Sequence, residues 1–140
     1  MDNTEMNRVA SDKPARDDEP RNIVMHVNFA DAERLNLVLN NVDNILDHYL
    51  ERANRVAIRV VCHGPGLAML RSDSSPVQER IRKMTTERQQ VAFYACSNTL
   101  ARITRAEGRT PELIAGSIPV PAGLPEIIEL QRQGWIYLKP

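Results

Sequence analysis

Short apolar runs alternate with amphipathic stretches from residue 22 to the end of the chain. Apolar runs of four to eight residues are typical of buried strands, and apolar positions three and four residues apart are typical of helices. The pattern predicts strands at 23–27, 55–61, 91–95, 118–120 and 135–138, with helices at about 32–50, 75–88, 97–106 and 125–133. Pro119 makes the fourth strand the weakest of these predictions, because proline has no N–H to donate to a sheet.

The regular alternation of strand and helix predicts an α/β fold. We expect a flavodoxin-like, doubly wound, mainly parallel sheet of five strands in the order 2-1-3-4-5, with helices on both faces. In such sheets a ligand binds beside the carboxyl ends of the strands, where the strand order reverses. With this order the reversal falls between the first and third strands, at residues 28–31 and 96–99, and the turn at 63–66 lies nearby.

The first 21 residues differ from the rest of the chain. They carry six acidic residues, four basic residues and two prolines, and very few large apolar side chains. A segment of this composition buries too little apolar surface to offset the entropy lost on ordering. We therefore predict a disordered polar tail at residues 1–21 and one folded domain at residues 22–140.

Composition narrows the class of protein. The 140 residues include 18 Lys and Arg and 18 Asp and Glu, so the net charge is zero and nothing suggests a nucleic-acid partner. No apolar run approaches a membrane span, and the N-terminus lacks the apolar core of a signal peptide, so we predict a cytoplasmic protein without a membrane partner. The two cysteines are too few for a disulfide framework, and no zinc-type spacing occurs. No metal and no cofactor is expected.

The strongest chemical signal is the segment 91–100, where a strand-like run ends at Cys96 and the polar residues Ser97, Asn98 and Thr99 open a helix. Free backbone N–H groups and the helix dipole at such a position favour a negative charge. A cysteine there has a lowered pKa and therefore more thiolate, which is the reactive form. We predict that Cys96 is a reactive thiol and that Ser97, Asn98 and Thr99 bind an anion beside it.

Other polar residues fall near the expected site. Asn28 follows the first strand, and His63 and Gly64 open a tight turn after the second strand. We predict that these three residues also contribute to binding the anion or substrate. A histidine in a turn is often only solvated. His63 is therefore either a solvated side chain or a group that assists the Cys96 thiol. His26 lies inside the first strand and is either a packed residue or a functional one. Cys62 is either a buried small apolar residue or a second thiol near the reactive one.

Several segments, taken in order, resemble the DsrE/DsrF-like family, which includes the YchN-like proteins and the sulfur-relay subunits of the Dsr and Tus systems. The resemblance covers residues 22–140. It is carried by the first strand with Asn28, VVCHGPG at 60–66, FYACSNTL at 93–100, VPAG at 120–123 and QRQGWIYLKP at 131–140. The relay subunits usually have small residues and an Arg-Gly pair after the cysteine. This chain has Ser97, Asn98, Thr99 and Leu100 there instead, so it looks like the small stand-alone members.

This resemblance implies a flavodoxin-like sheet and assembly into trimers or hexamers. It also implies that a cysteine at the end of the third strand carries a persulfide, and Cys96 matches that position. The expected function is a cysteine-based sulfur carrier or transferase that works with a donor or acceptor protein, and whether it is an enzyme stays open. Trp135 and Tyr137 share one face of the last strand and serve either as subunit contacts or as core residues.

Two other functions remain open. In the first, the chain is a non-enzymatic oligomeric module that binds a small ligand or a partner, and Cys96 is only a packed residue. In the second, Cys96 and Arg102 form a thiol phosphatase or arsenate-reductase-like site, because a C-x5-R spacing lets amides and one guanidinium hold an oxyanion. Leu100 and Ala101 suit a helix better than an anion-binding loop, which weighs against this second alternative.

Overall fold

The centre of the structure is a five-stranded sheet in which all neighbouring strands run parallel. The computed structural model describes residues 18–140, so residues 1–17 of the predicted tail lie outside the described part of the chain. All five strands fall on segments that the apolar pattern predicts, including the one that contains Pro119. The strands are β1 (Arg21–Val27), β2 (Val56–Cys62), β3 (Val91–Cys96), β4 (Ile118–Val120) and β5 (Ile136–Leu138).

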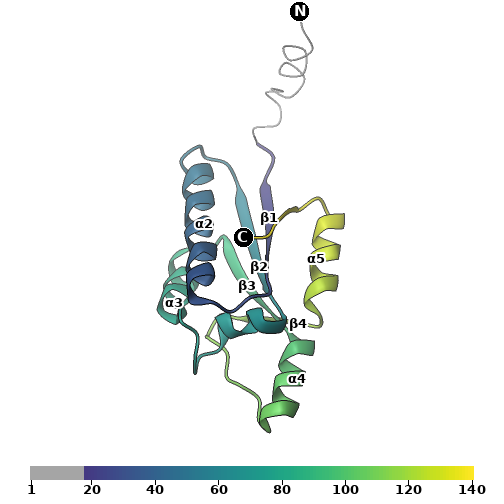
Figure 1. Ribbon diagram of the computed structural model, residues 1–140. Helices are drawn as coiled ribbons and strands as arrows, with labels where there is room; N and C mark the ends of the chain where they lie inside the picture. Colours follow the sequence, from purple (N-terminus) through teal and green to yellow (C-terminus); the bar gives the residue numbers. More distant parts are fainter. Residues whose placement is uncertain (1–17) are drawn as a thin grey trace, which may run out of the picture.

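Helices cover both faces of the sheet, as the alternating pattern predicts (Figure 1). Helices α2 (Ala32–Leu50) and α3 (Gln78–Glu87) lie on one face together with the 3₁₀ helix η2 (Gly64–Leu70), and α5 (Gly123–Arg132) lies on the other. Helix α4 (Ser97–Glu107) extends beyond the carboxyl ends of the strands. Within residues 18–140, no helix has the length and the apolar character that crossing a membrane requires.

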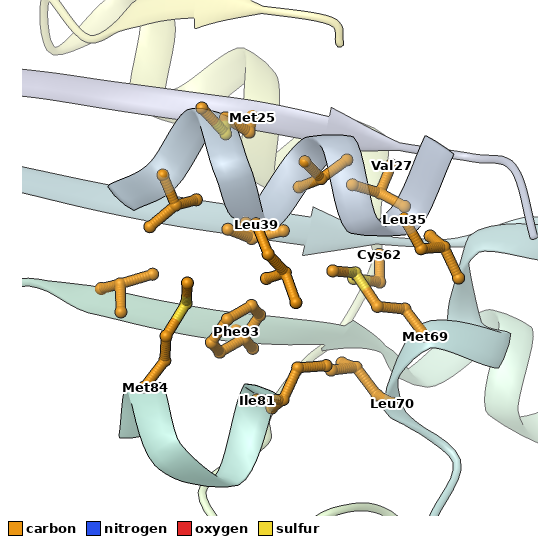
Figure 2. Close-up of a cluster of buried hydrophobic side chains, with 14 of the residues drawn as sticks. Met25, Val27, Leu35, Leu39, Cys62, Met69, Leu70, Ile81, Met84 and Phe93 are labelled. Carbon is orange, nitrogen blue, oxygen red and sulfur yellow. The ribbon is translucent and has the colours of Figure 1, made fainter. Parts of the chain in front are cut away.

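Each face of the sheet has its own apolar core. The larger core lies under α2, η2 and α3 and includes Met25, Leu39 and Phe93 (Figure 2). The smaller core lies under α5 and includes Val24 and Ile127. Because successive side chains of a strand point to opposite faces, Val24 and Met25 enter different cores. Both faces of the sheet are therefore buried along β1, β2 and β3, which explains why these strands are nearly continuous apolar runs.

The strand order is β4-β3-β2-β1-β5, so the predicted order 2-1-3-4-5 is wrong. Strand β2 pairs with both β1 and β3, and the first three crossovers therefore move across the sheet in the same direction. Only the last connection runs back, to place β5 beside β1. A right-handed crossover that runs back must lie on the opposite face, which is where α5 is found. The apolar pattern sets which segments are strands but not the direction of each crossover.

With this strand order, the expected ligand-binding crevice lies between β3 and β4 instead of between β1 and β3. Cys96 still lies beside it. The chain leaving β3 enters α4, whose Leu100 and Ile103 pack against the larger core. The chain leaving the neighbouring strand β4 enters α5 on the other face. The two connections diverge between the carboxyl ends of β3 and β4, and this is the kind of place where open α/β sheets bind ligands. Cys96 is paired with Val120 at that point.

Candidate functional site

Cys96 lies at the junction of β3 and α4, as the sequence predicts. It is the last residue of β3 and also the residue that caps α4. Its Sγ accepts a hydrogen bond from the backbone N–H of Thr99 at 3.5 Å. Only 5% of Cys96 is exposed. The sulfur therefore takes the place of the side-chain oxygen that usually satisfies a free N–H at the start of a helix.

Several donors surround this sulfur. Burial raises the pKa of the Cys96 thiol, whereas the hydroxyl and the backbone N–H of Thr99 lower it. The backbone N–H groups of Gly123 and Asn98 lower it further, and the thiol pKa falls below its ordinary value. Gly123 is the first residue of α5, so the N-terminal ends of two helices meet at one sulfur. Both helix dipoles favour the thiolate.

Thr99 is held in place by the turn that follows β2. Its Oγ1 accepts a hydrogen bond from the backbone N–H of Gly64 at 2.9 Å, and Thr99 is buried. Because this bond occupies a lone pair, the hydroxyl hydrogen remains available for Sγ of Cys96. Gly64 therefore does not contact the thiol itself. Its N–H orients the Thr99 hydroxyl, which contacts Sγ of Cys96.

A cavity of about 180 Å³ opens in front of the thiol. Of the residues predicted from the sequence, the cavity is lined by His63, Cys96, Asn98, Thr99 and Arg102. The beginning of α5 closes its other side with Ala122, Gly123, Leu124 and Pro125.

Three of the residues predicted to bind an anion or substrate, Ser97, Asn28 and Gly64, lie outside the lining of this cavity. Ser97 lines a separate hollow with Leu100 and Thr104. Asn28 is half-buried at the end of β1 and is not part of the lining.

Arg102 faces the same cavity as Cys96, but the chain between them does not form an anion-binding loop. Residues 97–102 are the first turns of α4, so their later N–H groups bond within the helix. Only the first turn presents free amides to the cavity. This geometry does not reproduce the loop of amides on which the phosphatase-like alternative depends.

Cys62 lies on the other face of the sheet, in the larger core (Figure 2). It is fully buried, and its Sγ lies 3.9 Å from the sulfur of Met69. Burial raises the pKa of this thiol far above its ordinary value. Cys62 is therefore a packed apolar residue, and it does not supply a second thiol beside Cys96.

His63 also belongs to a chain of three polar side chains that the sequence interpretation did not join. Its Nε2 lies 2.6 Å from Nε2 of His26, and Nδ1 of His26 lies 2.6 Å from the hydroxyl of Tyr137. The two imidazole rings are stacked with centroids 4.8 Å apart. The alternation of side chains along β1 could have indicated the position of His26, because it places His26 on the same face of the sheet as Val24, toward α5. The pairing of β1 with β5, which brings Tyr137 near, could not be read from the sequence.

Both histidines favour the neutral form. Burial lowers the pKa of His26, and the neighbouring His63 and the charge of Lys139 lower it further. Burial also lowers the pKa of His63, with a further contribution from Lys139. Within residues 18–140, no three His, Cys, Asp or Glu side chains come together as a metal site.

Comparison with known proteins gives a structural relative. MTH1491 from Methanobacterium thermoautotrophicum, described as a protein of unknown function, is 35% identical in sequence. The match covers 84% of this chain and 97% of MTH1491, with a TM-score of 0.71. No family model matches the chain, and no curated protein matches it. The likeness supports the α/β fold.

Proposed function

This chain belongs to the same family as MTH1491, and we propose that it is a sulfur carrier of the DsrE/DsrF type in which Cys96 holds a persulfide. The observation that carries the proposal is the thiol itself. Cys96 has a lowered pKa and lines a cavity, and N–H groups from the starts of two helices converge on its sulfur. A packed structural cysteine needs none of these features, and Cys62 has none of them.

The loading step requires only a thiolate and a donor persulfide. Sγ of Cys96 attacks the outer sulfur of R–S–SH, a new S–S bond forms, and the original S–S bond breaks with its electron pair going to R–S⁻. The product is Cys96–S–SH. An acceptor thiolate then attacks the outer sulfur, and the electron pair of the broken bond returns to Sγ of Cys96. Neither step needs an external oxidant or reductant.

The donors around Sγ suit both halves of this cycle. The hydroxyl of Thr99 and the N–H groups of Thr99, Asn98 and Gly123 stabilise the thiolate that attacks and is later released. The cavity of about 180 Å³ has room for one extra sulfur and for the end of a donor or acceptor, but not for a bulky cofactor. The donor or acceptor protein therefore presents its sulfur from outside the cavity.

The proposal also includes the cellular compartment and the oligomeric state. The two unpaired thiols lie on opposite faces of the sheet and fit a compartment where thiols stay reduced, such as the cytoplasm. Assembly into a homotrimer or homohexamer belongs to the proposal because the DsrE/DsrF resemblance implies it. The exposed apolar side chains of β5, Ile136 and Leu138, are candidate contacts.

The test is the mass of the intact protein after incubation with glutathione persulfide. We expect the wild-type protein and Cys62→Ser to gain one sulfur atom, and Cys96→Ser to gain none. Cys62→Ser is the matched control, because it removes the other thiol of the chain. No gain on the wild-type protein, together with iodoacetamide labelling only after unfolding, would instead support the packed-cysteine module. Hydrolysis of an aryl phosphate that depends on both Cys96 and Arg102 would support the phosphatase.

A further inference from the structure

The three hydrogen-bonded side chains beside the cavity come from different parts of the chain. Tyr137 is on the edge strand β5, His26 is on β1, and His63 follows β2. Each of the two links is 2.6 Å long, and His26 is 8% exposed whereas Tyr137 is 37% exposed. The chain therefore begins at a surface hydroxyl and ends at an imidazole that lines the cavity of Cys96.

Nδ1 of His63 is available to a group bound in the cavity. Its Nε2 is used by His26, and within residues 18–140 nothing forms a hydrogen bond with its Nδ1. The His63 side chain is also tightly placed. A Cβ added to Gly123 would lie 2.9 Å from its Cβ, 3.3 Å from the ring atom Cγ, and 3.5 Å from Cβ of Cys96. His63 and Cys96 thus flank the same point at the start of α5, and Gly123 leaves the space between them open.

From this arrangement we infer that Tyr137, His26 and His63 form a proton relay, and that His63 is the acid–base group for the sulfur carried by Cys96. The inference rests on the proposed function. His63 lines the cavity and is the catalytic group. His26 and Tyr137 act through it and are positioning residues.

The need for a proton arises in the discharge step. A persulfide in the form Cys96–S–S⁻ repels an incoming thiolate, whereas Cys96–S–SH accepts attack at its outer sulfur. Nδ1–H of His63 gives its proton to the outer sulfur, while Nε2 of His63 takes the proton of His26. Nδ1 of His26 then takes the proton of the Tyr137 hydroxyl, which water replaces at the surface. The proton leaves with the acceptor persulfide. When the next Cys96–S–SH loses its proton to Nδ1 of His63, the relay runs in reverse and Tyr137 releases a proton to water, so both rings regain their first tautomers and protons and electrons balance over the cycle.

A relay suits this environment better than a single charged imidazole. Burial and the charge of Lys139 disfavour an imidazolium at either ring, and concerted transfer leaves both rings neutral. The other titratable or charged side chains beside His63 are His26, Cys96 and Arg102. The α5 residues that line the cavity carry no charge.

The experiment compares two reactions of the same cysteine. Protein loaded with glutathione persulfide is discharged by dithiothreitol between pH 5.5 and 9, and the sulfide released is measured. Rates are expressed relative to wild type at each pH, which cancels the titration of dithiothreitol. Unloaded protein is alkylated with iodoacetamide over the same range, a reaction that needs a thiolate but no proton donor. The variants are His63→Gln, His26→Gln and Tyr137→Phe, and His48→Gln is the control because His48 is the remaining histidine, on α2.

We expect His63→Gln to slow discharge about 100-fold, at the lower end of the range of general acid–base effects, and to change its pH profile. His26→Gln and Tyr137→Phe slow discharge about tenfold and leave alkylation within about twofold of wild type, while His48→Gln changes neither reaction. Parallel loss of discharge and alkylation in these variants overturns the relay, because it shows a structural role. Normal discharge in His63→Gln also overturns it and leaves the sulfur carrier intact. Absence of loading in wild type overturns both proposals.

Discussion

Cys96 and Cys62 show how the position of a residue decides the chemistry of a thiol. Both cysteines end a strand of the same sheet, and both are at least nine-tenths buried. Cys62 points into the apolar core beside Met69, where burial alone acts on it and raises its pKa. Cys96 points to the start of α5, where hydrogen-bond donors outweigh burial and lower its pKa. The sign of the pKa change follows from the face of the sheet on which each sulfur lies.

Thr99 is the donor that can be removed with the least change in shape. Thr99→Val deletes the hydroxyl and is expected to raise the pKa of Cys96, because a hydrogen bond to a charged group contributes about 1.5–3 kcal/mol. The thiolate fraction below the pKa then falls about tenfold, and the stronger nucleophilicity of a more basic thiolate offsets part of this. We expect the pH–rate curve of iodoacetamide alkylation to move to higher pH, with alkylation about fivefold slower on its rising limb. Thr99→Ser keeps the hydroxyl and should behave like wild type, and an unmoved curve in Thr99→Val would contradict the assignment of this donor.

At the scale of elements, the close approach of η2 to β1 fixes the position of His63. A Cβ added to Gly66 would lie 2.0 Å from the carbonyl oxygen of Val27, so only glycine fits there. The same carbonyl accepts the backbone N–H of His63 at 3.1 Å. The turn after β2 is thus held against the end of β1, which carries His63 to the cavity.

Gly66→Ala is therefore expected to destabilise the protein by about 3 kcal/mol or more, because the added Cβ is fixed to the main chain and the oxygen it meets is a backbone atom of a strand. Gly134→Ala is the matched control: Gly134 has a φ of +94° and open space around it, so alanine there costs only backbone strain of about 1–2 kcal/mol. Urea unfolding measures both values. We also expect Gly66→Ala to slow discharge of Cys96 persulfide, since it displaces His63. Equal destabilisation by the two variants would show that the contact with Val27 does not constrain the turn.

The sequence predicts the individual strands and helices better than it predicts how they are arranged. The central strands β1, β2 and β3 follow from their apolar runs, because burial on both faces imposes them. Pro119 is tolerated because β4 is an edge strand and is largely exposed. The position of Cys96 at a strand-to-helix junction is likewise a local property and was predicted. The strand order was not, because periodicity carries no information on crossover direction. The link from Tyr137 to His26 depends on β5 pairing with β1, so it was out of reach for the same reason.

At the scale of the whole molecule, parallel strands gather side chains that are far apart in the sequence. His26, His63 and Cys96 each lie at or just beyond the carboxyl end of a strand, and these ends meet at one edge of the sheet. Because the fold partly buries the imidazoles of His26 and His63 at this edge, their protonation affects the free energy of unfolding. Their lowered pKa values mean that the folded protein takes up these protons at lower pH than the unfolded chain does.

This difference predicts how stability depends on pH. As the pH falls through about 6.5, the histidines of the unfolded chain bind protons while those of the folded protein do not. The unfolded state then holds more protons, so the free energy of unfolding decreases as the pH decreases. Urea unfolding at pH 7.5 and pH 5.5 should show this loss in wild type and in His48→Gln, and a smaller loss in the double variant His26→Gln, His63→Gln. Asp73 and Glu107 do not interfere, since hydrogen bonds from Arg71 lower their pKa values and keep both ionised throughout. An equal loss in the double variant would mean that the two histidines are not held neutral by the fold, and the relay would lose its physical basis.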